Sequence, residues 1–121
     1  MLSGIELARP DEWYICCGPK GHDKFVAIHA EPCRLRDIPE YDLFLDCRDG
    51  GWIVTCGVTG TALSMGRSRA EALELAELSY QVHGREGLQR LTAGWLDTHP
   101  LSPRYRWAVG VANRGEKGGD A

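Results

Sequence analysis

Residues 41–58, YDLFLDCRDGGWIVTCGV, decide the fold of this chain. Asp49 and Gly50 form a two-residue turn signal, because a type I′ turn needs positive φ at both central positions. A hairpin closed at that turn pairs Arg48 with Gly51, Cys47 with Trp52, Leu45 with Val54, Leu43 with Cys56 and Tyr41 with Val58. The last four pairs share one apolar face, and a slip of one residue would turn that face outward. We therefore predict a hairpin with one face on a core and the other face largely wet.

A second hairpin is predicted upstream of the first. Residues 13–17 are a dense apolar run rich in β-forming side chains, and residues 24–30 follow a loop of turn-forming residues. Antiparallel pairing across this loop brings Trp13 near Ile28 and Ile15 near Val26. Both faces of this pair are largely apolar, so we expect it to be more buried than the hairpin of residues 41–58. Residues 31–40 hold two prolines and alternating charges, which predicts an irregular surface connection.

Ser68 and Glu71 have the spacing of a capping box, which predicts the start of a helix. Gly84 fits the C′ position that ends a helix. Residues 85–96 then repeat apolar side chains at spacings of three and four, which predicts a second helix. The first helix carries more apolar surface than one sheet requires, so we expect the second helix or a partner to cover the remainder.

Together these elements predict an α+β domain. We expect an antiparallel sheet of two β-hairpins, about four strands, with two helices packed on one face. Residues 104–112 could add an edge strand. We assign residues 1–112 to this single domain and residues 113–121, which are Gly-rich and charged, to a disordered C-terminal tail.

Composition excludes several classes of protein. The 121 residues carry a net charge of −3, which favours no particular partner. No stretch approaches the roughly 20 apolar residues of a membrane span, and the N-terminus lacks the pattern of a signal peptide. The five cysteines show no small-disulfide spacing, so we expect a cytoplasmic protein with free thiols and no contact with membranes. Eleven arginines against three lysines suggest a bacterial or phage source.

No motif predicts an enzyme, a metal site or a cofactor. The set Cys17, His22, His29 and Cys33 has zinc-ligand chemistry but lacks the close pairs of known zinc sites. The Gly-rich residues 57–61 match neither the phosphate-binding nor the dinucleotide-binding pattern. We therefore expect a non-enzymatic protein without a cofactor.

One segment has the chemistry of a nucleic-acid contact. Arg104, Tyr105, Arg106 and Trp107 interleave cations with aromatic rings, which suits phosphates and stacked bases. The alternative is an amphipathic edge strand whose arginines extend along the surface.

Residues 41–83 resemble the core of HicB-type antitoxins. The resemblance rests on DGGWIV at residues 49–54 and on GRSRAEAL at residues 66–73, where that family pairs an Asp-Gly hairpin with a helix introduced by Gly-x-Ser/Thr-x-x-Glu-Ala. The Pro-x-Leu-Pro-Gly segment of the family is missing, and no DNA-reading motif is evident. The resemblance implies a sheet-plus-helix module and a toxin-neutralising role, and no functional residue carries over.

These observations predict a small bacterial or phage accessory protein that binds and regulates or inhibits a macromolecular partner. An antitoxin-like protein or an anti-defence protein such as an anti-CRISPR fits this class. A protein partner is expected to meet acidic areas that contain Asp42, Asp46, Glu74 and Glu77. The alternative is a nucleic-acid-binding accessory protein that uses residues 104–107. A homodimer is compatible with either hypothesis.

Overall fold

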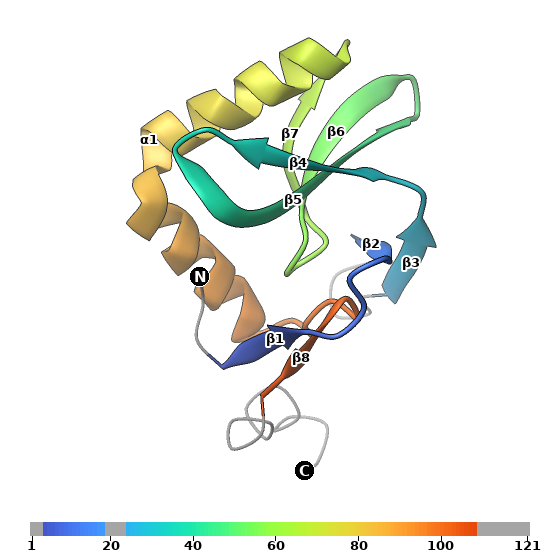
Figure 1. Cartoon of the computed structure of the whole chain (residues 1–121), viewed down its shortest axis with the longest axis vertical. Helices are drawn as coiled ribbons and strands as arrows, with labels where there is room; N and C mark the ends of the chain where they lie inside the picture. Colours follow the sequence, from blue (N-terminus) through green and yellow to red (C-terminus); the bar gives the residue numbers. More distant parts are fainter. Residues whose placement is uncertain (1–3, 19–23, 109–121) are drawn as a thin grey trace.

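The computed structural model describes residues 4–18 and 24–108 (Figure 1). The elements in chain order are β1 (Ile5–Leu7), β2 (Trp13–Cys17), β3 (Lys24–Ile28), β4 (Glu31–Leu35), β5 (Ile38–Arg48), β6 (Gly51–Cys56), β7 (Ala62–Gly66), α1 (Arg69–Leu96) and β8 (Tyr105–Trp107). The proposed disordered tail at 113–121 lies outside the described residues, as do the last four residues of the expected strand at 104–112.

The strands form three antiparallel sheets rather than one. The largest has the order β4-β5-β6-β7, and the two smaller sheets pair β2 with β3 and β1 with β8. The predicted fold class is therefore wrong: the described residues form eight strands in three sheets and a single helix, not four strands under two helices. The two predicted hairpins both exist, but they belong to different sheets.

The registers of both hairpins are confirmed, except that the β5–β6 pairing ends at Leu43 and Cys56 and does not include the predicted pair of Tyr41 and Val58. In the larger sheet Leu43 lies opposite Cys56 and Leu45 opposite Val54, and the β5–β6 turn has φ values of 54° at Asp49 and 77° at Gly50. In the β2–β3 sheet every predicted pair occurs, from Trp13 with Ile28 to Cys16 with Phe25. Turn chemistry and side-chain alternation are local signals, which is why they determine register without knowledge of the rest of the fold.

Residues 31–40 are not the irregular connection that their prolines suggested. Strand β4 and the start of β5 occupy this range, and Pro32 lies opposite Phe44. Strand β4 is at the edge of its sheet and contains an irregularity in register between Cys33 and Leu35. Proline is tolerated there because an edge strand leaves one row of backbone groups without a strand partner.

Helix α1 begins where the capping signal predicted. Ser68 is its N-cap, and the Ser68 hydroxyl accepts a hydrogen bond from the Glu71 backbone N–H at 3.1 Å. The Glu71 carboxylate accepts from the Arg67 backbone N–H at 2.7 Å, one residue earlier than a capping box requires.

The predicted break at Gly84 occurs, but it is a kink within one helical element rather than a boundary between two separate helices. Gly84 does adopt a positive φ of 71°, but the chain resumes helical geometry immediately, so α1 bends there and continues to Leu96. Contacts beyond the bend hold this second half in place. Arg85 forms an ion pair with Glu40 and donates to the Asp37 carbonyl at 2.8 Å. The helix therefore never folds back over its own outer face.

The apolar core lies between α1 and the four-stranded sheet. Its buried members are Leu35, Ile38, Leu43, Leu45, Val54, Ala72, Ala76 and Leu88. Small alanines on the inner face of α1 allow the helix to approach the strands closely. Gly66 has the same role on β7, since a Cβ there would overlap the backbone of Ala72.

The opposite face of the sheet is buried as well, which contradicts the prediction of a largely wet face. Phe44 and Thr55 are each 0% exposed, and the Trp13 ring packs on Phe44 with 5.0 Å between ring centroids. The relative burial of the hairpins is also reversed, because no residue of β3 is buried whereas five of the eleven residues of β5 are. The alternation on β5 and β6 did not reveal that a second layer covers them.

Candidate functional site

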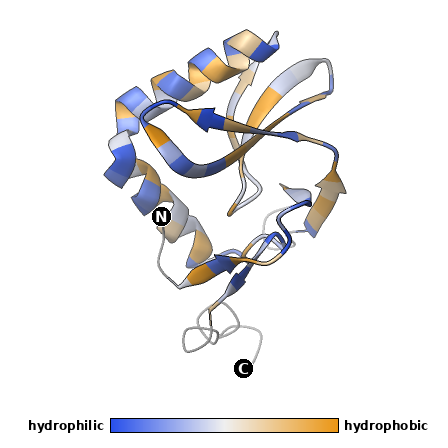
Figure 2. Cartoon of the chain, in the orientation of Figure 1, coloured by the Kyte–Doolittle hydropathy of each residue, from blue (hydrophilic) through white to orange (hydrophobic). Residues whose placement is uncertain are grey.

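The outer face of α1 carries a stripe of exposed apolar side chains. Leu75, Leu78 and Val82 recur at intervals of three and four, which places them on one side of the helix. Their exposed fractions are 38%, 58% and 79%, respectively. We call these three residues the outer stripe. Figure 2 shows hydrophobic and hydrophilic residues alternating along α1, because the inner and outer faces are both partly apolar.

The outer stripe is exposed because the inner face of α1 already meets the sheet. Ala72 and Ala76 contact the core from the inner side. A second helix was the expected cover for the remaining apolar surface, but α1 is the single helix of the described residues and extends past Gly84. The sequence therefore supplies apolar surface that the described part of the chain leaves uncovered. Exposed apolar surface of this kind often marks an interaction site.

Acidic side chains accompany the outer stripe. Residues 70–82 contain Glu71, Glu74 and Glu77 and no basic residue. Glu74 is exposed, and Glu77 is half-buried and accepts a hydrogen bond from the Arg36 backbone N–H at 3.1 Å. A bond from a neutral backbone donor leaves the carboxylate charge in place. The first half of α1 therefore presents an apolar stripe beside negative charge, and two of the predicted partner-binding residues, Glu74 and Glu77, belong to it.

Arg104 has an internal role. It is 5% exposed, and its guanidinium forms a two-bond pair with the Asp42 carboxylate, from Nε to Oδ2 at 2.7 Å and from Nη2 to Oδ1 at 3.0 Å. Its Nη1 donates to the backbone carbonyls of Arg9, Pro10 and Glu12 at 3.2, 2.6 and 3.2 Å. These bonds join the segment between β1 and β2 to strand β5.

An aromatic ring completes the environment of the buried guanidinium. The Arg104 Cζ lies 3.6 Å from the centroid of the Trp13 ring, close enough for a cation–π contact. A Cβ at Gly57 would overlap the Asp42 carboxylate, so the lack of a side chain there admits the ion pair. We call Arg104, Asp42 and Trp13 the Arg104 junction. Its hydrogen bonds compensate the burial of both charges.

The remaining residues of the 104–107 segment do not form a cationic surface. Tyr105 is 7% exposed. Burial, and to a smaller extent a hydrogen bond to Asp42, raises the pKa of its phenol above the ordinary value of 10.0. Arg106 is exposed and pairs with Glu6 at 2.6 Å, and Trp107 is half-buried. The structure thus separates the two arginines that the nucleic-acid hypothesis combines.

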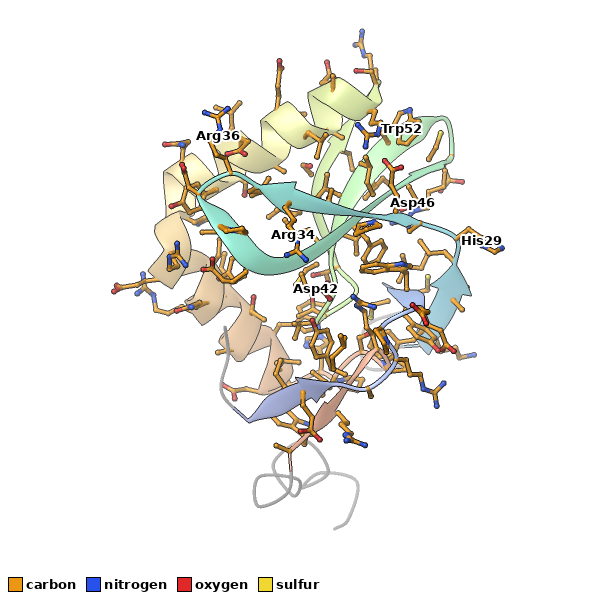
Figure 3. The ribbon with its side chains drawn as sticks, in the orientation of Figure 1. His29, Arg34, Arg36, Asp42, Asp46 and Trp52 are labelled. Atoms are coloured by element: carbon orange, nitrogen blue, oxygen red, sulfur yellow. The ribbon has the colours of Figure 1, made fainter. Side chains whose placement is uncertain are left out.

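Asp46 is buried rather than solvated. Asp46 is 7% exposed, and its Oδ2 lies 3.0 Å from Arg48 Nε. Its Oδ1 is shielded from solvent and has no hydrogen-bond partner. Burial raises the pKa of the Asp46 carboxyl, and Arg48 opposes that rise. Figure 3 labels both Asp42 and Asp46 on β5. Neither carboxylate is presented to a partner, because both are used inside the fold.

The described residues contain no group of three or more His, Cys, Asp or Glu side chains placed to hold a metal ion. His22, one of the four zinc-ligand candidates, lies outside that range. No disulfide bond joins any of the five cysteines, all of which lie within the described residues, and burial raises the pKa of the Cys33 thiol to about 11. A thiol with so high a pKa is a poor nucleophile at neutral pH. The helix within the described range is too polar to cross a membrane.

Comparisons with known proteins add no information to these geometric observations. No protein-family model, curated protein or solved structure matches the chain.

Sequence reasoning missed the Arg104 junction for a physical reason. Asp42 and Arg104 are separated by 62 positions, so no periodicity connects them. The outer stripe, in contrast, was visible as an excess of apolar residues on the predicted helix. Its spacing is local, and only the question of what covers it required the fold.

Proposed function

We propose that this chain is a non-enzymatic binding protein whose partner is another protein, docked on the outer face of α1. The observation that carries the proposal is the exposure of Leu75, Leu78 and Val82 on a helix that is capped and packed against a sheet. A helix held in this way loses little conformational freedom on binding, so more of the contact energy appears as affinity.

The partner that fits this face is an amphipathic helix with basic flanks. Apolar side chains spaced by three and four would pack against the outer stripe, as in other helix-in-groove and helix-pair contacts. Lys or Arg beside them would meet Glu71, Glu74 and Glu77, which speeds association and favours the correct partner. Regulation or inhibition of that partner is the role that the resemblance to HicB-type antitoxins supports. The lack of a disulfide bond among the five cysteines, all within the described residues, fits a cytoplasmic location.

Site-specific photocrosslinking tests this proposal. A photoreactive phenylalanine analogue replaces Val82 in one variant and the exposed Arg90 of the same helix in a control variant, and both are expressed in a bacterial cell. We expect the Val82 variant to give an adduct whose crosslinked peptide is a basic amphipathic helix. We expect that adduct to disappear when Leu78→Asp is added.

Other adducts contradict the proposal. A crosslink to a second copy of this chain would assign the outer stripe to a homodimer. A crosslink to nucleic acid would favour the alternative hypothesis. Adducts that are the same for both positions, or that survive Leu78→Asp, would show that the outer stripe is not a docking site.

A further inference from the structure

A cavity lies between the second half of α1 and the turn that joins β6 to β7. It consists of two adjoining spaces of about 60 and about 230 Å³. Both spaces are lined by Cys56, Leu63, Leu88 and Thr92, so they meet at a common wall. The bend at Gly84 precedes this part of the helix, and Leu88 is the one described residue beyond the bend that belongs to the buried core.

The walls of the larger space are uncharged. No Asp, Glu, Lys, Arg or His is among the described residues that line it. Its hydroxyl groups already have partners: Thr59 and Thr61 share a hydrogen bond at 2.7 Å, and Thr92 donates to the Leu88 carbonyl at 2.9 Å. A charged ligand would lose its hydration with no opposite charge in the described lining to replace it, whereas an apolar ligand would leave these bonds intact.

Trp95 contributes an aromatic side chain to the lining of the larger space. Its ring is stacked on His99, with 3.6 Å between centroids and 8° between planes, which fixes the orientation of the indole. Leu91 also lines the space and is 56% exposed, so the space reaches the surface beside it. Aromatic rings pack favourably against such a side chain in offset or edge-to-face geometry.

We infer that this cavity is a binding site for a small, uncharged, aromatic molecule of one or two rings. Its size supports this class, because an apolar cavity of about 150 Å³ already accommodates benzene. The site is separate from the outer stripe, which precedes Gly84 on the same helix. The inference therefore does not depend on the proposed protein partner.

Nuclear magnetic resonance with the full-length chain tests the inference, with indole as the probe. We expect saturable shifts of the Leu63, Leu88 and Trp95 signals and intermolecular contacts between indole protons and the two leucine side chains. Benzoate has a similar size but carries a charge, and we expect it to cause no saturable shift. An absence of saturation by indole, saturation at another surface, or equal binding of benzoate would overturn the inference.

A pair of variants adds a second readout. Thr92→Leu enlarges a side chain on the common wall and should weaken indole binding roughly tenfold or more. Gln81→Leu, an exposed position on the same helix, is the matched control and should leave the affinity unchanged. Undiminished binding by a folded Thr92→Leu variant would overturn the inference. Contacts between residues 109–121 and the cavity in the free protein would also overturn it, because the chain would then fill the site itself.

Discussion

The apolar core between α1 and the four-stranded sheet and the Arg104 junction are both buried, but different interactions stabilise them. Beneath α1, aliphatic side chains from four strands pack on two alanines. At the Arg104 junction, one guanidinium satisfies a carboxylate and three backbone carbonyls while lying over an indole ring. The comparison teaches that the four-stranded sheet is built by local patterns, whereas the N-terminal segment is attached by long-range contacts, among which the buried charge of Arg104 joins it to strand β5.

The largest effect is expected at the Arg104 junction. Arg104→Ala leaves the Asp42 carboxylate without its partner and removes the donors of three carbonyls. Breaking a buried pair in this way should lower the free energy of unfolding by about 3–5 kcal/mol. Arg106→Ala is the control: its ion pair with Glu6 is exposed, so the expected loss is below about 1 kcal/mol. Urea denaturation measures both values, and equal losses would show that the junction is peripheral.

A smaller effect is expected in the apolar core, because neighbouring side chains can partly fill the cavity that a truncated side chain leaves. Leu45 is 1% exposed, and Leu45→Ala should cost about 2–5 kcal/mol, with the exact loss set by how far the core relaxes. Leu78→Ala on the outer stripe removes the same atoms from a side chain that is 58% exposed. That change should stay within about 0.5 kcal/mol in the same urea experiment. A large loss for Leu78→Ala would mean that the outer stripe is covered in the isolated protein.

The smallest effect is a pH dependence at Asp46, on the face of the sheet opposite α1. Burial raises the pKa of this carboxyl above its ordinary value of 3.8, so the folded state binds the proton more tightly than the unfolded state. Stability then falls as pH rises from 3.8 through the folded pKa.

Asp46→Asn removes this titration while keeping a polar group of similar shape. Relative to the wild type, the variant should therefore gain stability as pH rises from about 4 to about 7. Thermal unfolding across this range measures the difference. A difference that is constant with pH, or that changes in the opposite direction, would contradict the role assigned to Asp46.

Predictions from the sequence succeeded where the interacting residues are close in the chain and failed where they are far apart. The Asp49–Gly50 turn and the Ser68 cap are encoded within a few residues, and both occur in the structure. Pro32 of β4 and the glycine at position 84 were interpreted from their average behaviour. Their outcome was decided by the sheet edge and by the contacts of Arg85, neither of which is visible in a local window.

The candidate site divides in the same way. The outer stripe and its glutamates follow helical spacing, so the sequence indicated them before the fold was known. The 104–107 segment was misleading because alternating arginines and aromatic rings have the same composition in a surface contact and in a buried junction. Asp42 and Trp13 decide between these roles, and both lie far from the segment in the sequence.

The Arg104 junction also constrains the order in which the chain acquires its structure during synthesis. The partners of the Arg104 side chain precede it by 62 to 95 positions, so the ribosome releases them long before the arginine itself. Strands β4 to β7 and the first half of α1 have their partners within a shorter window and can assemble as they emerge. Long sequence separation slows contact formation. In the nascent chain, Asp42 therefore lacks its ion pair and Trp13 its cation–π contact until Arg104, one of the final described residues, has been synthesised.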